Sequence, residues 1–405
     1  MSDTIINQGE IPIHNTDHFD LYKYRWFILA LFCSYACINF VQYLQYSIIA
    51  NIISRYYDID TFTVNWTSLV FMISYIVLFI PVSYLMEVLN LRQISILASC
   101  LTACGVGIRL FSVSPDSFYI VLIGQSLAAV AQVFIMSLPS KLAAVWFGSK
   151  EVSTACAFAV LGTQLGVAFG CIISPNVVKN HDDIDLIGEE LFGLIMYNSI
   201  IAYTICFLVV VFFEARPPTP PSYSQIMVGQ QRQTAYFSSL KQLVKNKDYV
   251  LLLIAIGLSN GIWNAFGIEL NSIYLNYFPN GEEDAGLLAL IAVVSGGCVG
   301  SLLFGFILDK THKFKLTTFT ILFLSSIFFI LTAISLEKQH RIFTFITGGV
   351  FGFFLAGSLV VGFEYSAEVA YPEPEATALA FLNAVILFFG LIFSVAIDFL
   401  SDIIG

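Results

Sequence analysis

Apolar runs of membrane-spanning length recur along almost the whole chain, and they constrain the fold more than any other feature. A helix needs about 20 consecutive apolar residues to cross a bilayer, whereas a strand of a membrane barrel needs roughly ten alternating ones. The runs here have the helical length, and the 405-residue chain is 58% hydrophobic and only 11% charged. We therefore predict an all-α membrane protein. Eleven spans are predicted, at residues 26–50, 66–88, 94–111, 118–144, 154–174, 191–213, 249–274, 287–308, 316–336, 342–361 and 377–400.

A polar segment divides these spans into six and five. It contains "EARPPTPPSYSQ", whose prolines prevent it from being helical throughout. We predict a cytoplasmic tail at 1–21, a six-helix bundle at 22–213, a cytoplasmic linker at 214–247 and a five-helix bundle at 248–405.

The lysines and arginines indicate the orientation. With the N-terminus in the cytoplasm, all but five of the 18 lie on the cytoplasmic side, as the positive-inside rule requires. The five exceptions are Arg55, Arg109, Lys179, Lys338 and Arg341.

Residues typical of catalysis are scarce. All eight cysteines fall inside apolar segments and none pairs with histidine at metal-ligand spacing, so we interpret them as packing residues. We find no nucleophile–base pair, metal cluster or phosphate-binding loop. We therefore expect neither an enzyme nor a cofactor, no nucleic-acid partner, and a monomer in the lipid bilayer.

Two helical bundles joined by a cytoplasmic linker resemble a major facilitator superfamily transporter. The stretch "GSLLFGFILDKTHKFK" at 300–315 is similar to the inner-loop signature of that superfamily, with small residues followed by Asp309 and Lys310. The corresponding loop of the first half, "PVSYLMEVLNLRQ", is a weaker match that contains Glu87 and Arg92. These residues are expected to shape an inner gate; an ordinary basic loop is the alternative.

The resemblance also implies twelve helices with both chain ends in the cytoplasm. Because only eleven spans are present, we expect a twelfth helix to be missing from this form of the chain. The alternatives are a transporter that works without it and a truncated, non-transporting membrane protein.

Several blocks, in the same order along the chain, resemble the feline leukaemia virus subgroup C receptor-related transporters. They include "VNWTSLVFMISYI" at 64–76, "PSKLAAVWFGSKEVSTACAFAVLGTQLGVAFG" at 139–170 and "GFEYSAEVAYPEPEATALAFLNA" at 362–384. The resemblance implies a facilitative, alternating-access carrier of choline or a similar small organic cation such as ethanolamine. Haem is the older attribution for this family. The plasma membrane is the expected location, with an organelle membrane as the alternative.

Choline is a quaternary ammonium that aromatic rings bind well, at roughly 0.5–2 kcal/mol for a good contact. By resemblance, Trp66 matches the tryptophan of the family's aromatic cage; the alternatives are an interfacial tryptophan and a glycosylation sequon at Asn65. Gln164, in the middle of an apolar helix, matches an amide that binds the substrate hydroxyl. Its alternative role is to join packed helices.

Departures from the family pattern affect the rest of the expected site. Asn264 stands where the family has a tyrosine, with Trp263 beside it, and Leu387 replaces a glutamine. We include Asn383, in the same helix as Leu387, among the substrate-binding residues.

Glu269 lies in an apolar span where the family has a leucine. Our hypothesis is that its carboxylate supplies charge to a cationic substrate. The alternative is a glutamate at the outer helix end that reaches water.

Glu364 and Glu368 are four residues apart on one helix face near its cytoplasmic end. We expect them to pair with loop cations and shape the inner gate; proton coupling is the alternative role.

A haem carrier would need axial ligands, usually histidine, and cations for the propionates. None of the five histidines lies inside an apolar span, so we rank haem below a small organic cation. They are His14, His18, His181, His312 and His340.

Overall fold

The computed structural model describes residues 22–148, 151–218 and 236–404, and within these ranges the chain is helical and connected by short loops. Eleven of its helical segments are long and apolar enough to cross a membrane, which confirms the eleven predicted spans. The tail at 1–21 with His14 and His18, and residues 219–235 of the linker, lie outside the described residues.

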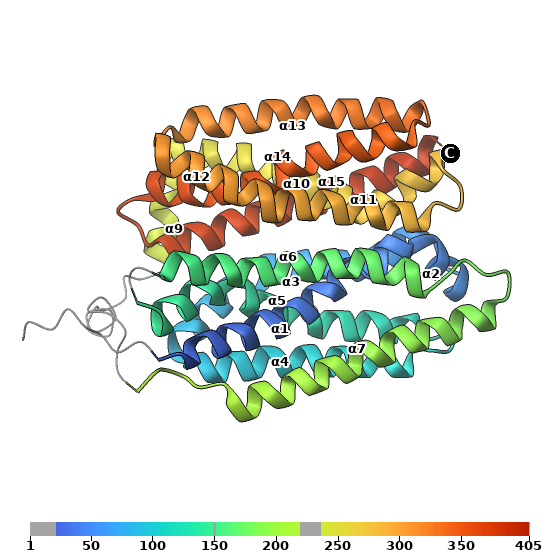
Figure 1. The fold of residues 1–405 in the computed structure, drawn as a ribbon, viewed down its shortest axis with the longest axis horizontal. Coiled ribbons are helices and arrows are strands. Elements are labelled where there is room, and N and C mark those ends of the chain that lie inside the picture. Colours follow the sequence, from blue (N-terminus) through green and yellow to red (C-terminus); the bar gives the residue numbers. More distant parts are fainter. Residues whose placement is uncertain (1–21, 149–150, 219–235, 405) are drawn as a thin grey trace, which may run out of the picture.

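The first six spans form one bundle, which is the lower layer in Figure 1. Most of these helices run past the apolar stretch into polar residues at one or both ends, and so exceed the predicted limits. The elements are α1 (Tyr24–Leu44), η1 (Ser47–Ile49), α2 (Ala50–Tyr57), α3 (Thr61–Val88), α4 (Leu91–Ile108), η2 (Arg109–Phe111), α5 (Phe118–Trp146), α6 (Val152–Val177) and α7 (Ile184–Phe212).

The other five spans form the second bundle, the upper layer in Figure 1. Its elements are α9 (Tyr236–Lys245), α10 (Lys247–Tyr277), α11 (Glu282–Val294), η3 (Ser295–Gly300), α12 (Ser301–Thr311), α13 (Phe314–Glu337), α14 (Arg341–Ala370) and α15 (Glu375–Ile404). We call the two bundles the N half and the C half.

Side-chain caps begin several of these helices. Asn90 accepts a hydrogen bond from the Gln93 amide while the Gln93 side chain bonds back to the Asn90 amide, which starts α4 with a capping box. Asn246 accepts from the amides of Asp248 and Tyr249 at the start of α10. These caps satisfy amides that a helix leaves free at its first turn.

The first span is not one continuous helix. The predicted span at 26–50 is broken by the 3-10 turn η1, after which α2 continues to Tyr57. Such a break frees backbone groups that must be satisfied away from water. Asn271 of α10 does this from the other half: its amide donates to the Ile48 carbonyl at 2.9 Å, and its Oδ1 accepts from the Asn51 amide at 3.2 Å.

The two halves pack along a seam in which α6 contacts α11 and α3 contacts α15. Gly286 of α11 lies so close to α6 that an added Cβ would be 2.3 Å from the Cys171 carbonyl oxygen. Small residues allow this approach of helix backbones within a bilayer.

A second close approach occurs at the π-helical turn η3, in the middle of the eighth span. A Cβ on Gly296 would lie 2.0 Å from the Gly352 carbonyl oxygen of α14. The wide turn η3 therefore packs directly on the α14 backbone, as single π-turns inside longer helices often do at functional positions.

Large apolar side chains cover the outside of both halves. Phe207 on α7, Leu302 on α12 and Phe319 on α13 are all more exposed than buried. Such a surface would be unfavourable in water but suits lipid. The chain is thus an integral, multi-pass membrane protein.

Candidate functional site

A central cavity of about 140 Å³ lies on the seam between the two halves. The N half lines it with residues of α1, α3, α5 and α6, and the C half with residues of α10, α11, α14 and α15. None of the side chains that line it in the described part of the chain carries a formal charge. Its polar and aromatic lining residues are Phe40, Tyr43, Phe71, Gln132, Gln164, Asn260, Trp263, Asn264, Phe266 and Asn383.

Aromatic rings reach this cavity from both halves. Tyr43 of α1 packs edge-on against Phe71 of α3, with 5.6 Å between ring centroids. Trp263 of α10 packs in the same way against Phe351 at 5.7 Å. Because the rings are held by other rings, their faces and edges are pre-positioned, the arrangement in which an organic cation is bound well.

Amide side chains form the other part of the lining, and one hydrogen bond crosses the cavity. The Tyr43 hydroxyl of the N half donates to Asn264 Oδ1 of the C half at 3.2 Å. Asn264 donates in turn to the Asn260 carbonyl at 3.0 Å, and Asn260 donates to the Ser358 hydroxyl at 3.2 Å. A substrate that enters between Tyr43 and Asn264 would therefore change a contact between the halves.

A buried arginine supports the N-half wall of the cavity. Arg109 is fully buried, donates to the Gln42 and Gln125 side chains, and lies over the Tyr46 ring at 5.6 Å. Gln125 donates to the Gln42 carbonyl at 3.0 Å, next to Tyr43 in the chain. The topology argument counted Arg109 simply as an outside charge, whereas the structure shows it joining α1, α5 and η2.

The structure brings four of the predicted substrate-binding residues together. Gln164, Trp263, Asn264 and Asn383 all line the cavity, as does Leu387. The Gln164 side chain lies against η3, since a Cβ on Gly297 would be 3.2 Å from it. These four residues come from three helices, α6, α10 and α15.

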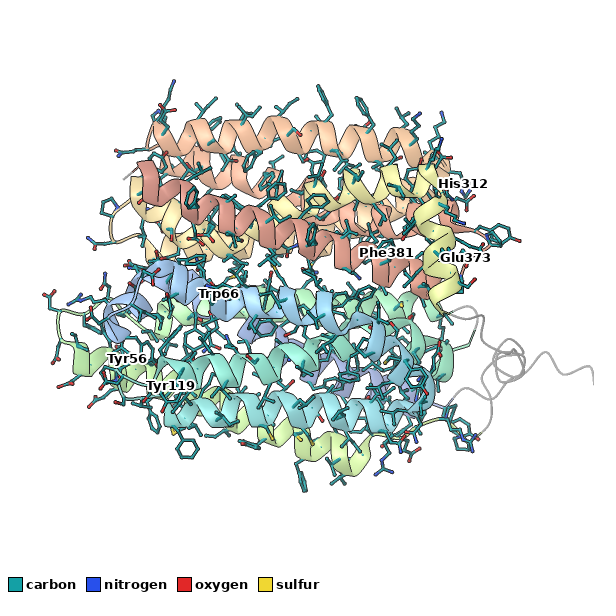
Figure 2. All side chains as sticks on the ribbon, turned by 180° about the vertical axis from the view of Figure 1, so that it is seen from behind. Tyr56, Trp66, Tyr119, His312, Glu373 and Phe381 are labelled. Carbon is teal, nitrogen blue, oxygen red and sulfur yellow. The ribbon has the colours of Figure 1, made fainter. Side chains whose placement is uncertain are left out.

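Trp66 does not line this cavity. It is 37% exposed, and its ring packs against Phe62 with 6.0 Å between centroids. In Figure 2 it lies toward the end of the molecule marked by Tyr56, away from His312 and Glu373. Successive residues of a helix point about 100° apart, so the burial of Asn65 and Thr67 turns Trp66 outward.

Tyr43 is an aromatic lining residue that the sequence analysis missed. It stands in "VQYLQYSII", where two tyrosines follow glutamines in an apolar helix. The polar neighbours Gln42 and Gln45, both buried, were the available signal that this turn faces the protein interior rather than lipid.

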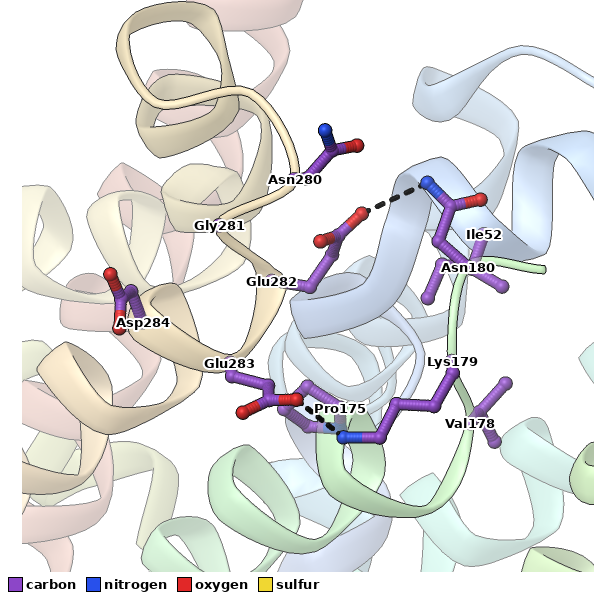
Figure 3. A pocket seen from close by; sticks show the side chains of 10 residues that line it. All are labelled: Ile52, Pro175, Val178, Lys179, Asn180, Asn280, Gly281, Glu282, Glu283 and Asp284. Carbon is purple, nitrogen blue, oxygen red and sulfur yellow. Dashed lines mark hydrogen bonds and ion pairs between the residues drawn. The ribbon is translucent and has the colours of Figure 1, made fainter.

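Polar contacts join the halves at one end of the seam, which the predicted topology places outside the cytoplasm; we call it the outer end. Glu282 of α11 accepts from Asn51 at 2.7 Å. It also accepts from Asn180 at 3.1 Å, and Lys179 pairs with Glu283 at 2.6 Å (Figure 3). A pocket of about 290 Å³ lies among these residues. We call Asn51, Lys179, Asn180, Glu282 and Glu283 the outer seal.

A second set of polar contacts lies between the outer seal and the cavity. Asn65 of α3 donates to Glu269 Oε2 of α10 at 3.0 Å. Glu269 is 1% exposed and does not line the cavity, although its neighbour Leu270 does. Glu269 therefore does not reach water at a helix end in this conformation.

The predicted gating residues lie at the opposite, inner end. Lys310, Glu364, Glu368 and Glu87 are exposed there, and the Asp309 side chain is outside the described residues. Their roles at a gate stay predictions.

At the first-half loop, two cations bind helix carbonyls: Arg92 of the loop and Lys141 of α5. Arg92 donates to the Val210 carbonyl at 3.1 Å. Lys141 donates to the carbonyls of Met86 and Leu89, at the end of α3. Cations are favourable at such a helix C-terminus.

Two helical halves around a central cavity, joined by polar contacts at one end, define a membrane transporter of the alternating-access class. The family model described as Major Facilitator Superfamily matches residues 31–402. The chain belongs to this superfamily, and within it to the family of the choline/ethanolamine transporters, with which it is 35–39% identical over the aligned residues.

Two relatives illustrate that family. The chain is 39% identical to "Choline/ethanolamine transporter flvcr2a" of Danio rerio over 96% of its length and 83% of the relative's. It is 35% identical to "Choline/ethanolamine transporter FLVCR2" of Homo sapiens, over 92% of its length and 71% of the relative's. These matches confirm the family resemblance drawn from the sequence blocks.

A solved structure shows the same fold. The bacterial homologue of the human lysosomal transporter Spinster, in an inward-facing and unoccupied conformation, aligns with a TM-score of 0.69. It is 12% identical, and the alignment covers 92% of this chain and 81% of that one.

Proposed function

We propose that this chain is a facilitative, alternating-access carrier of choline or ethanolamine, and not an enzyme. The observation that carries the proposal is the uncharged, aromatic and amide-lined cavity on the seam, crossed by the Tyr43–Asn264 hydrogen bond. The names of the relatives support the same substrate class.

The lining suits a cation that must also be released. Rings and amides attract a quaternary ammonium by about 0.5–2 kcal/mol per contact. A buried carboxylate would bind it more tightly and would carry a large desolvation penalty when empty. An uncharged lining therefore suits a carrier, which must release its substrate, better than a protein that retains it.

The two substrates should use this lining differently. Choline has no N–H group and depends on the rings, above all Tyr43 and Trp263. Ethanolamine carries a primary ammonium, which donates hydrogen bonds to amide oxygens such as those of Asn264 and Asn383.

Haem fits this lining poorly. The lining contains no histidine, lysine or arginine in the described part of the chain. His181 lies near the outer end, where it contacts Glu190 at 2.9 Å, and His340 precedes α14 at a helix start. A haem would find neither an axial ligand nor a partner for its propionates in the cavity.

The test is uptake of labelled choline and labelled ethanolamine by cells that express the chain or its variants. Trp263→Ala should lower choline uptake by roughly 2- to 30-fold, the equivalent of one lost cation–π contact. Trp66→Ala is the matched control, because it also removes a tryptophan, but one that lies outside the cavity.

Two outcomes would count against the proposal. One is saturable uptake of neither substrate from surface-expressed protein. The other is a larger effect of Trp66→Ala than of Trp263→Ala, which would move the substrate site away from the cavity. Asn264→Ala should affect ethanolamine more than choline.

A further inference from the structure

A buried arginine lies beside the break in the first span. Arg109, the first residue of η2, is 0% exposed, and within the described residues no carboxylate forms a salt bridge with it. A buried charge without an opposite charge is costly, and ionisable residues inside a membrane usually have a function. An unpaired guanidinium is therefore better explained by what it holds than by the stability it adds.

The end of α1 is held by side chains from two other helices. α1 ends at Leu44, inside the first span, and the last carbonyls of a helix have no amide partner within that helix. Gln125 of α5 donates to the Gln42 carbonyl at 3.0 Å, and Ser68 of α3 donates to the Tyr43 carbonyl at 2.5 Å. Tyr43 thus stands in a turn whose carbonyls are bound from both sides.

Arg109 orients the amides that hold this turn. Its guanidinium donates to Gln125 Oε1 at 3.3 Å, which leaves Gln125 Nε2 directed at the Gln42 carbonyl. It also donates to Gln42 Oε1, while Gln42 Nε2 donates to the Ile38 carbonyl at 2.9 Å. A planar guanidinium presents several donors in a fixed fork, which a lysine ammonium does not. Both glutamine amides therefore have their orientation fixed by one side chain.

The surroundings suit a cation of this shape. The C-terminal end of a helix carries a partial negative charge, and a cation beside it is favourable. The Arg109 guanidinium lies at the end of α1, with its carbon 5.6 Å from the centroid of the Tyr46 ring just beyond that helix. Gly124 of α5 leaves room for the arginine, since an added Cβ would be 2.6 Å from Arg109 Cγ. Helix end, ring and glycine together accommodate an arginine.

Tyr43 connects this arrangement to the cavity. Arg109, Gln42 and Gln125 do not line the cavity, whereas Tyr43 does. The Tyr43 hydroxyl donates to Asn264 across the seam. Rotation of the last turn of α1 would therefore move both the ring and the hydroxyl that this residue presents to a substrate.

We propose that Arg109 is a positioning residue for substrate binding. Through Gln42 and Gln125 it fixes the last turn of α1, and it thereby holds Tyr43 in the cavity without touching the substrate itself. Resting on the proposed function, this makes the binding of choline, which depends on the rings, more sensitive to Arg109 than the binding of ethanolamine.

A first experiment requires no substrate. Tyr43 is replaced by fluorotyrosine in the purified full chain, and its fluorine NMR line is recorded. Arg109→Lys keeps the charge and loses the fork, and Gln125→Met keeps the volume and loses the amide; each should shift or broaden the line. Arg216→Lys, the same substitution at an exposed arginine, should leave the line unchanged.

A second label separates a local effect from a general loss of structure. Tyr249 of α10 is fully buried in the C half, and its hydroxyl donates to the Ala378 carbonyl at 2.7 Å. Fluorotyrosine at position 249 should give the wild-type line in both Arg109→Lys and Gln125→Met. Using two variants protects the test if one of them fails to fold.

A second experiment measures the KM and the maximal rate of labelled-choline uptake. Arg109→Lys should raise the KM by roughly 2- to 30-fold, the range of one weakened cation–π contact, with a smaller rise for ethanolamine. In a Tyr43→Ala background the same substitution should change the KM by less than about twofold, because the ring that Arg109 positions is absent and the two effects are then not additive.

The two experiments fail separately. Without any choline uptake by the wild type the proposed function falls, but the fluorine line at position 43 still tests the positioning. An unchanged line at position 43 in both variants, an equal change at position 249, or a KM effect that persists in the Tyr43→Ala background would each overturn the role of Arg109.

Discussion

The central cavity and the outer seal lie on the same seam, yet they use different chemistry. The cavity is lined by rings, amides and apolar residues without formal charge, whereas the outer seal is built from glutamates, a lysine and asparagines. Weak, uncharged contacts let a cation bind and leave. Charged and amide contacts between the halves hold one end closed until the conformation changes. Substrate binding and closure of the outer end therefore depend on different side chains and on different kinds of contact.

The largest expected effect comes from blocking closure of the seam itself. Gly286→Ala places a methyl group 2.3 Å from the Cys171 carbonyl oxygen and 2.7 Å from Pro175. Overpacking costs about 1–3 kcal/mol, so uptake should fall by roughly 5- to 150-fold. Spin labels on the outer ends of α3 and α15 should show a larger separation.

The matched control is Gly193→Ala on α7, where an added Cβ meets no atom within 4 Å. Its uptake and label distances should equal those of the wild type. Normal closure in Gly286→Ala would mean that this contact does not limit the outer end.

Placing a charge in the cavity would break the distinction between the two regions. Asn264→Asp puts a carboxylate beside Tyr43, where Coulomb attraction to a cation is strong. We expect a KM for choline about tenfold lower, equivalent to about 1.4 kcal/mol. The maximal rate should also fall, because stabilising the bound state alone raises the barrier to the conformational step. Uptake kinetics measure both; an unchanged KM would place the cation elsewhere. Asn264→Ala controls for loss of the amide.

Removing the shared acceptor of the outer seal should have a smaller effect. Glu282→Ala leaves the amides of Asn51 and Asn180 without the carboxylate that joins them. We expect closure to weaken by about 0.5–1.5 kcal/mol, the net contribution of a hydrogen bond, seen as a shift of the spin-label distances toward the open state. Glu282→Gln keeps an acceptor oxygen and should shift them less; equal shifts would show that charge rather than hydrogen bonding holds the end closed.

The smallest effect is expected for the exposed ion pair. The side chains of Lys179 and Glu283 are 37% and 63% exposed, and such pairs contribute about 0–1 kcal/mol. Lys179→Ala should therefore change uptake by less than about fivefold, since 1 kcal/mol corresponds to that factor. A loss comparable to that of Gly286→Ala would show that this pair controls the outer end.

The spans and the family could be predicted because they depend on local properties. Eleven apolar runs became eleven helical spans, and the overall match to relatives confirmed the family that blocks such as 139–170 had indicated. Gln164 was recognisable because a glutamine in an apolar helix must find a polar environment. Asn264 was singled out because it stands where the family has a tyrosine, and Asn383 because it lies in the same helix as Leu387.

The choice between Trp66 and Tyr43 could not be made in this way. Both are aromatic residues in apolar helices, and which one faces the cavity depends on the rotation of α3 and on the break at η1. Moving one position along a helix turns the side-chain direction by about 100°, and a hydropathy average does not contain that direction. The partner of Glu269 was hidden for a related reason, since Asn65 lies on a different helix far from it along the chain.

The sequence by itself determined that this protein crosses a membrane with helices, where each span lies and to which family it belongs. Hydropathy is a sum over neighbouring residues, so it can be read directly from the sequence. Inside a bilayer there is no water to bind the backbone, so an apolar span forms a helix that satisfies its own hydrogen bonds. Only the tertiary structure decided which side chains share the cavity, which form the outer seal and which residue of the N half contacts Glu269. Those pairings come from packing between helices distant in sequence, where rotation and close approach select the contacts.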